Sequence, residues 1–158
     1  MFKADNLGNI RNAPKIGVNM LDIGKIAKKG CTAIVVDDDE DTVNLFAEFL
    51  EICDVKVLGK AFDGNQAVEL YQKIFPDLVF SDVMMPGYDG FYVLKKIRQT
   101  NPHAIMVMIT GDVRPETIDK LQELKADAIV YKPFDMKQVV DTINTLLANS
   151  VYQTQISQ

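Results

Sequence analysis

The chain has 158 residues, of which 47% are apolar and 25% are charged, and its formal net charge is −5 at pH 7. This composition is typical of a soluble globular protein, and no apolar run approaches the length needed to span a bilayer. We expect neither membrane insertion nor direct nucleic-acid binding, because the latter depends on Lys and Arg side chains that neutralise phosphates.

The first 30 residues differ from the rest of the chain. They carry six basic and two acidic side chains, contain scattered Asn and Gly, and show no clear periodicity. We predict that residues 1–30 form an N-terminal extension that is flexible or loosely docked. No apolar segment typical of a secretory signal follows Met1, and Cys31 and Cys53 form no metal-ligand pattern. We therefore expect a cytoplasmic protein with two free thiols.

Five short apolar runs follow residue 30, and each of them ends at polar or turn-forming residues. Runs of this kind, rich in β-branched and aromatic residues, are typical of buried strands in a parallel sheet. The predicted strands are residues 32–36, 55–61, 78–82, 104–109 and 127–131.

Segments with helical periodicity separate and follow these runs. Asp63 followed by Gln66 predicts a capping box at the second helix, Pro115 fits the first turn of the fourth, and Asp135 caps the fifth. The predicted apolar stripe of the first helix consists of Leu45, Phe46, Phe49 and Leu50. On the third helix we interpret three residues as a solvated basic cluster, namely Lys95, Lys96 and Arg98.

The alternation of strands and helices predicts an α/β fold, in which helices cover both faces of a doubly wound five-stranded parallel sheet. The expected strand order is 2-1-3-4-5, as in flavodoxin-like folds, and it places strands one and three on either side of the switch point. One domain over residues 31–149 accounts for these elements, and residues 150–158 are a polar C-terminal tail. Because no room remains for a second domain, any effect on other molecules is expected to pass through the surface of this one.

Polar side chains follow four of the five predicted strands. Asp37 and Asp38 follow strand one, Asp82 ends strand three, Thr110 follows strand four and Lys132 follows strand five. All these strand ends lie at the same edge of a doubly wound sheet, where such folds bind ligands. We therefore expect three carboxylates, a hydroxyl and an ammonium group to meet there.

Such a carboxylate cluster is unfavourable on its own. Two carboxylates about 4 Å apart repel each other by roughly 4 kcal/mol at an effective dielectric constant near 20. A hard divalent ion such as Mg²⁺ relieves this repulsion and prefers oxygen ligands. Lys132 and the Thr110 hydroxyl then supply a charge and a donor for an anionic group, and the set is suited to a phosphoryl group on a carboxylate oxygen.

Four segments agree in order and spacing with the signature blocks of a known family: IVVDDDED, DLVFSDVMMPGYDG, MVMITGD and YKPF. Over residues 31–149 the chain resembles the receiver domains of two-component response regulators. The resemblance implies a stand-alone (βα)5 receiver that takes a phosphoryl group from a histidine kinase or a histidine phosphotransfer protein. It implies signalling by phosphorylation-dependent binding to another protein, and no enzymatic activity beyond the receiver's own phosphorylation and dephosphorylation.

The resemblance also implies the chemical roles of the clustered residues. Asp82 is expected to accept the phosphoryl group, and Thr110 and Lys132 are expected to bind the phosphoryl oxygens. The bond between Lys132 and Pro133 is expected to be cis, which proline permits at low cost.

For the metal, the resemblance implies coordination of Mg²⁺ by Asp38, Asp82 and the main-chain carbonyl of Met84, with Asp37 helping through water. Thr42 and Val43 lie a turn beyond Asp38. We hypothesise that these two residues flank the site and help a donor protein to dock.

One position departs from the family pattern. Receiver domains couple a Thr such as Thr110 to an aromatic residue on strand five, but the matching residue here is Ile129, which cannot make that aromatic rotation. Tyr131 lies two residues further along the same strand face. Met84 and Asp112 occupy positions whose side chains can shape the approach of water, so we expect them to set the lifetime of the phosphoryl group.

Two other functions remain as alternatives. The first is a metal-dependent phosphatase or phosphotransferase with an aspartyl-phosphate intermediate, although the chain offers no cap domain or additional substrate-binding segment. The second is a pseudo-receiver adaptor that works without phosphate. A flavodoxin-like nucleotide binder is excluded, because three successive carboxylates, Asp37 to Asp39, repel phosphate unless a metal intervenes.

Overall fold

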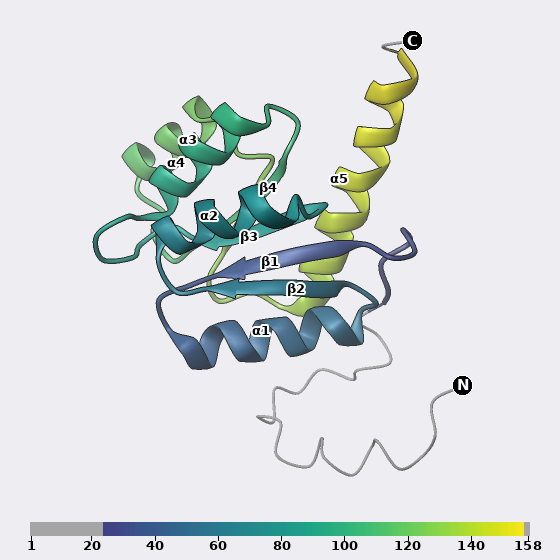
Figure 1. Cartoon of the computed structure of the whole chain (residues 1–158), viewed down its shortest axis with the longest axis horizontal. Coiled ribbons are helices and arrows are strands. Elements are labelled where there is room, and N and C mark those ends of the chain that lie inside the picture. Colours follow the sequence, from purple (N-terminus) through teal and green to yellow (C-terminus); the bar gives the residue numbers. More distant parts are fainter. Residues whose placement is uncertain (1–23, 157–158) are drawn as a thin grey trace.

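The computed structural model describes residues 24–156, in which strands and helices alternate (Figure 1). The strands are β1 (Thr32–Val36), β2 (Lys56–Ala61), β3 (Leu78–Asp82), β4 (Ile105–Thr110) and β5 (Ala128–Tyr131). The helices are α1 (Glu40–Ile52), α2 (Gly64–Ile74), α3 (Gly90–Thr100), α4 (Pro115–Glu123) and α5 (Met136–Ile156). None of the helices in this described part has the length and apolar character that crossing a bilayer requires.

The strands form one parallel sheet in the order β2-β1-β3-β4-β5. Helices α1 and α5 cover one face of the sheet, and α2, α3 and α4 cover the other (Figure 1). Every residue of the central strand β3 is buried. Leu78 and Phe80 belong to the core on the α1 and α5 side, whereas Val79 belongs to the core on the opposite side, as the twofold period of a strand requires. The predicted doubly wound α/β fold is confirmed.

The apolar face of α1 differs from the predicted stripe. The buried residues of this helix are Val43, Phe46, Ala47 and Leu50, whose spacings of three and four place them on one helical face. Leu45 lies on a different face and is 36% exposed. The prediction is therefore wrong for Leu45, which is apolar but does not belong to the core.

The predicted helix starts are confirmed. The backbone N–H of Gln66 donates to Asp63 Oδ1 at 2.8 Å, and Gln66 Oε1 accepts from the backbone N–H of Phe62 at 3.1 Å. In the usual capping box the Gln side chain accepts from the N–H of the N-cap residue itself, which is Asp63 here, so this bond is displaced by one residue. Pro115 lies in the first turn of α4, and Asp135 accepts a hydrogen bond from a backbone N–H three residues on, at the start of α5.

Residues 24–30, which we call the strap, pack against the side of the sheet at which the strands begin. We call this side the amino edge, and the side at which the strands end the carboxyl edge. Residues 1–23 of the predicted extension lie outside the described residues. In the strap, Ile26 is 6% exposed and belongs to the core under α1 and α5. The backbone N–H of Ile26 donates to the Cys53 carbonyl at 3.0 Å, and that of Ala27 donates to Asn144 Oδ1 on α5 at 2.9 Å. The strap therefore joins the end of α1 to the middle of α5.

Ion pairs hold the strap at two further points. Lys25 pairs with Asp54 at 3.0 Å, and Lys28 pairs with Asp77 at 2.6 Å. Asp77 also accepts hydrogen bonds from the backbone N–H and the hydroxyl of Thr32, at 2.9 and 3.1 Å. The contacts of the folded domain thus begin before Cys31, where we placed its start.

At the other end of the chain, α5 continues through the predicted domain boundary. Residues 150–158 were predicted to be a polar tail, but the helix extends to Ile156. Residues 157 and 158 lie outside the described residues.

One member of the predicted solvated cluster on α3 is not solvated. The Arg98 side chain is 15% exposed, and its guanidinium donates to the carbonyls of Pro102, Ala104 and Lys125 at 2.8, 2.6 and 2.6 Å. It also pairs with Asp127 at 2.9 Å. Arg98 therefore joins the end of α3 to the turn before β5, and its assignment to a solvated cluster is wrong.

Candidate functional site

The site is built on the end of β3. Asp82 is the last residue of that strand and pairs in register with Ile109 of β4, and the preceding Ser81 pairs with Val36, the last residue of β1. The start of α3 packs directly against the end of this strand. The approach is so close that a Cβ atom on Gly90 would overlap the carbonyl oxygen of Asp82. Only glycine fits this approach. Asp82 therefore lies at a close-packed position beside the end of β1.

Three carboxylates meet at this edge, as the strand ends predicted. Oxygen atoms of Asp37, Asp38 and Asp82 lie within 4.8 Å of one another. Asp37 and Asp82 are each only 7% exposed, whereas Asp38 is exposed. Asp39 instead caps α1, where its carboxylate accepts from the backbone N–H of Asp41.

Lys132 joins the cluster from the loop after β5. Its Nζ lies 3.0 Å from Asp82 Oδ1 and 3.4 Å from Asp37 Oδ2. Burial raises the pKa of Asp82, and although Lys132 lowers it, Asp37 and Asp38 raise it further, so that it stays above its usual value. Burial lowers the pKa of Lys132, but Asp82 and Asp37 outweigh burial and hold it above its usual value. Among the described residues, Lys132 is the cation that pairs with this cluster, and it contacts two of the three carboxylates, so the cluster is short of positive charge.

The donor set fits a magnesium ion. Asp37, Asp38 and Asp82 offer hard oxygen ligands without sulfur or imidazole, which is the set that Mg²⁺ prefers. A divalent cation would also supply the positive charge that Lys132 alone does not provide. The Met84 side chain is 55% exposed, and the role of its main-chain carbonyl remains a prediction.

Thr110 lies next to the cluster, on the strand beside β3. It is fully buried, and its Oγ1 accepts a hydrogen bond from the backbone N–H of Asp112 at 3.0 Å. In this hydrogen bond the Thr110 oxygen is the acceptor. The proton of the hydroxyl group is therefore available for donation to another group. No hydrogen bond within residues 24–156 joins Thr110 to Asp82.

Asp112 has a structural role that we did not predict from the sequence. Its carboxylate accepts from the backbone N–H and the guanidinium of Arg114 and from the hydroxyl of Thr117, which hold its pKa well below the usual range. The carboxylate is thus bound at the start of α4. An Asp shortly before a helix that begins with Pro115 is a recognisable capping signal, and it could have revealed this contact.

The remaining predictions around the site have mixed outcomes. Val43 is completely buried, so the hypothesis that it helps a donor to dock is wrong, because its small apolar side chain belongs to the core. The bond between Lys132 and Pro133 is cis, as predicted. Ile129 is half-buried against the core on the α2, α3 and α4 side, and Tyr131 pairs in register with Thr110.

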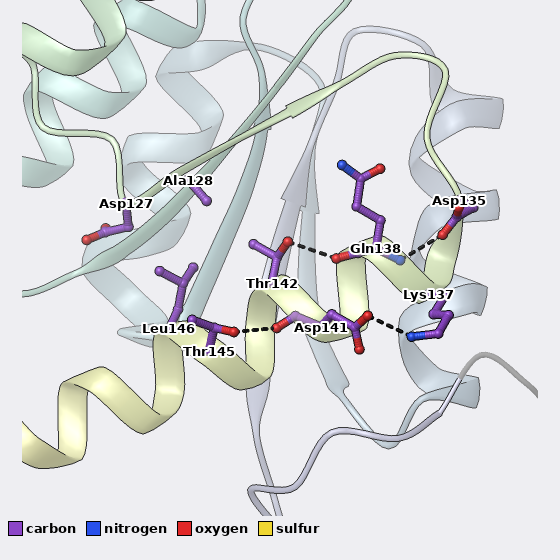
Figure 2. A pocket seen from close by; sticks show the side chains of 9 residues that line it. All are labelled: Asp127, Ala128, Asp135, Lys137, Gln138, Asp141, Thr142, Thr145 and Leu146. Carbon is purple, nitrogen blue, oxygen red and sulfur yellow. Dashed lines mark hydrogen bonds and ion pairs between the residues drawn. The ribbon is translucent and has the colours of Figure 1, made fainter.

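An open hollow of about 550 Å³ lies away from this cluster, beside β5 and the first turns of α5 (Figure 2). Asp127, Asp135 and Asp141 line it, and each is already bonded within the chain, to Arg98, to the start of α5 and to Lys137 respectively. The hollow contributes no residue to the carboxylate cluster.

Comparison with known proteins supplies independent information. The response regulator receiver domain family matches residues 33–144. The chemotaxis protein CheY of Halobacterium salinarum is 34% identical over 114 residues, which cover 72% of this chain and 94% of that protein. The transcriptional regulatory protein CpxR of Escherichia coli is 36% identical over 124 residues, 77% of this chain and 51% of its own length. A CheY-like receiver domain structure from Methanospirillum hungatei has the same fold, with a TM-score of 0.75 at 22% identity over 79% of this chain and 99% of that one.

Proposed function

The chain belongs to the response regulator receiver domain family, a family of phosphoacceptor signalling proteins, and from this premise we propose that Asp82 is its phosphoacceptor. The donor in this proposal is a phosphohistidine of a histidine kinase or a histidine phosphotransfer protein. One observation carries the assignment: Asp82 is a nearly buried carboxylate at the end of β3, 3.0 Å from the Lys132 ammonium group and beside two further carboxylates.

In the proposed reaction, an Asp82 carboxylate oxygen attacks the phosphorus atom of the phosphohistidine. A phosphorus–oxygen bond forms as the phosphorus–nitrogen bond breaks, and its electron pair returns to the imidazole, which takes up a proton. The attack requires ionised Asp82, and Lys132 keeps a positive charge beside the reacting oxygen. Hydrolysis of the acyl phosphate then returns the carboxylate and releases inorganic phosphate.

Asp37, Asp38, Asp82 and the Met84 carbonyl would hold Mg²⁺ in this proposal. The ion would supply positive charge to the transferred phosphoryl oxygens. Lys132 would bind one phosphoryl oxygen through its ammonium group, and Thr110 would donate its free hydroxyl proton to another. Their positions at neighbouring strand ends support this division of roles.

The proposed output is binding to another protein. Phosphorylation adds nearly two negative charges at neutral pH, which is enough to change the affinity of a protein surface for a partner. The excess of acidic over basic residues disfavours direct contact with nucleic acid. We place this activity in the cytoplasm, where the buried free thiols Cys31 and Cys53 remain reduced.

Intact mass tests the assignment after incubation with acetyl phosphate, with and without Mg²⁺. We expect one phosphoryl adduct that requires Mg²⁺ and is absent from Asp82→Asn. Asp77→Asn is the matched control, because Asp77 precedes the same strand at the opposite edge of the sheet, and it should keep the adduct. An adduct on Asp82→Asn would show that another residue is the nucleophile. No adduct from acetyl phosphate or from a phosphohistidine protein would favour the pseudo-receiver alternative.

A further inference from the structure

The start of α3 carries two tyrosines whose rings lie against each other. The ring centroids of Tyr88 and Tyr92 are 4.5 Å apart, with an interplanar angle of 38°. Tyr88 is exposed and Tyr92 is half-buried, and neither hydroxyl takes part in a hydrogen bond within residues 24–156. We call these two residues the tyrosine pair. It offers apolar ring surface and two hydroxyl donors to a partner.

The backbone that carries the tyrosine pair is held from two sides. The Tyr88 carbonyl accepts from the backbone N–H of Gly64, at the start of α2, at 3.0 Å, and a Cβ atom on Gly64 would overlap this carbonyl. The backbone N–H of Tyr92 donates at 3.0 Å to the carboxylate of Asp89, the N-cap residue of α3. A surface on a backbone fixed in this way has little freedom to lose when a partner binds.

Lysines extend this surface along α3 and the neighbouring α4. Lys96 lies one turn beyond Tyr92, with its Nζ 5.8 Å from the centroid of that ring, and Lys120 of α4 lies 4.2 Å from the centroid of Phe91. Lys95, Lys96 and Lys120 are exposed, and within the described part of the chain they form no ion pair. Helix α3 itself contains no acidic residue. Its outer face is therefore a positive region in a chain whose formal net charge is −5.

Rings and lysines share this face because residues three or four positions apart are neighbours on a helix. Interfaces combine an aromatic centre with a polar rim, and the charges of the rim are complementary to those of the partner. We infer that the tyrosine pair, with Lys95 and Lys96, is a docking surface for a short acidic segment of a partner protein. An apolar or aromatic side chain of the segment packs on the two rings. Its carboxylates pair with the ammonium groups and accept from the tyrosine hydroxyls.

This docking surface goes beyond the proposed function. None of its four residues belongs to the carboxylate cluster, so docking there does not require a phosphoryl group on Asp82. Rings and lysines would also suit a single-stranded nucleic acid, but the acidic chain as a whole repels a phosphate backbone over any longer contact. A short acidic segment fits the small extent of the positive region.

The test is a titration of the isotope-labelled full chain with a synthetic peptide made of Glu, Leu and Phe residues, followed by the NMR shifts of the backbone amides. We expect saturable shifts at residues 88–96, with a Kd on the order of 0.1 mM, as for a small transient contact. Raising the salt from about 50 to about 300 mM should weaken binding about threefold. A peptide with Gln in place of Glu, and one with Ala in place of Leu and Phe, should each bind at least about fivefold more weakly.

Variants of the chain locate the contact. Tyr88→Ala should weaken binding about tenfold, as for a ring at the centre of an interface. Phe75→Ala is its matched control, because Phe75 is 58% exposed and Tyr88 is 54% exposed, and it should have no effect. Lys96→Gln should weaken binding about threefold, and Lys56→Gln, on the edge strand β2, should not. When Lys95→Glu and Lys96→Glu are combined, the Glu peptide should lose its affinity, and the same peptide with Lys in place of Glu should gain it.

The outcomes keep this inference separate from the phosphoacceptor assignment. Shifts that fall outside residues 88–96, or equal affinity of the Glu peptide for the natural and the charge-reversed chain, would overturn it. Shifts at residues 88–96 with single-stranded oligodeoxythymidine but not with the peptide would overturn it in favour of nucleic acid. Concentration-dependent shifts there in the chain alone would overturn it in favour of self-association. Tyr88→Ala should keep the acetyl phosphate adduct, and loss of the adduct would show that Tyr88 serves the phosphoacceptor site instead.

Discussion

The two edges of the sheet each hold an aspartate of β3 or its preceding turn, and they compensate its negative charge to different extents. Asp77 precedes β3 and Asp82 ends it, so one strand carries an aspartate at each edge. At the amino edge, burial raises the pKa of Asp77, but Lys28 and Thr32 outweigh burial and hold it below its usual value. At the carboxyl edge, burial and the neighbouring carboxylates outweigh Lys132 and hold the pKa of Asp82 above its usual value.

The difference separates stability from function. At the amino edge each of three aspartates has a cation of its own: Lys25 pairs with Asp54, Lys28 with Asp77 and Arg98 with Asp127. The carboxyl edge has more negative than positive charge in a nearly buried setting, which is unfavourable until a cation or a phosphoryl group changes the balance. Uncompensated charges of this kind lower the stability of the fold, and such unfavourable arrangements are expected at functional sites.

The largest effect is expected at Arg98, which closes the amino edge. Arg98→Met removes its hydrogen bonds to three carbonyls and its pairing with Asp127. Because these partners are left unsatisfied in a mostly buried setting, we expect a loss of about 3–5 kcal/mol in the free energy of unfolding. Urea unfolding measures it, with Arg114→Met as the exposed control, whose loss should stay below about 0.5 kcal/mol. Equal losses would mean that the amino edge is not braced by this residue.

The second effect concerns the strap. Ile26→Ala leaves a cavity in the core under α1 and α5 and should cost about 2–4 kcal/mol. Ile52→Ala is the matched control, since Ile52 is 41% exposed, and its cost should be below about 1 kcal/mol. If the two variants unfold at the same urea concentration, the strap is only loosely docked, which is one of the two states predicted for the N-terminal extension.

These amino-edge contacts could not be predicted from the sequence. The main partners of Arg98 are backbone carbonyls, which leave no pattern in the residue types. The strap is too short to show a period, so Ile26 could not be distinguished from an apolar residue in a flexible leader. Both depend on how distant segments pack, which local rules do not describe.

The carboxyl edge, by contrast, was largely predictable. Alternating strands and helices predict a parallel sheet, and the carboxyl ends of its strands meet at one edge. That single rule was enough to bring Asp37, Asp38, Asp82 and Lys132 together, without any knowledge of their contacts. The rule places residues at an edge but does not orient them, which is why the direction of the Asp112 carboxylate was missed.

The stability contributed by Asp77 and by Asp82 should depend on pH in opposite directions. The pKa of Asp77 is lowered in the folded state, so its contribution to stability is complete above its unfolded value of about 3.9 and is lost as the pH falls through the folded value. Asp77→Asn should therefore cost about 1–2 kcal/mol at neutral pH, since the partner Lys28 is 47% exposed and its bond is weakened by solvent. The difference from the natural chain should shrink below about pH 4 in urea unfolding.

Asp82 should behave with the opposite sign. Its pKa is raised in the folded state, so the stability that protonation gives is present below the unfolded value and is lost as the pH rises through the folded one. Asp82→Asn, which imitates the protonated form, should therefore raise stability at neutral pH in the absence of Mg²⁺. A loss at neutral pH in both variants would remove the distinction between the edges.

The smallest expected effect is that of Mg²⁺ on stability. An ion that binds the folded chain at about five times its dissociation constant adds about 1 kcal/mol. We expect Mg²⁺ to raise the unfolding temperature of the natural chain by a few degrees, and the increase should vanish in Asp82→Asn and persist in Asp77→Asn. Both variants remove one negative charge, so a general effect of salt would act on them equally. If the increase vanished in both variants or in neither, the stabilisation would come from ionic strength, and the excess negative charge at the carboxyl edge would need another explanation than a metal site.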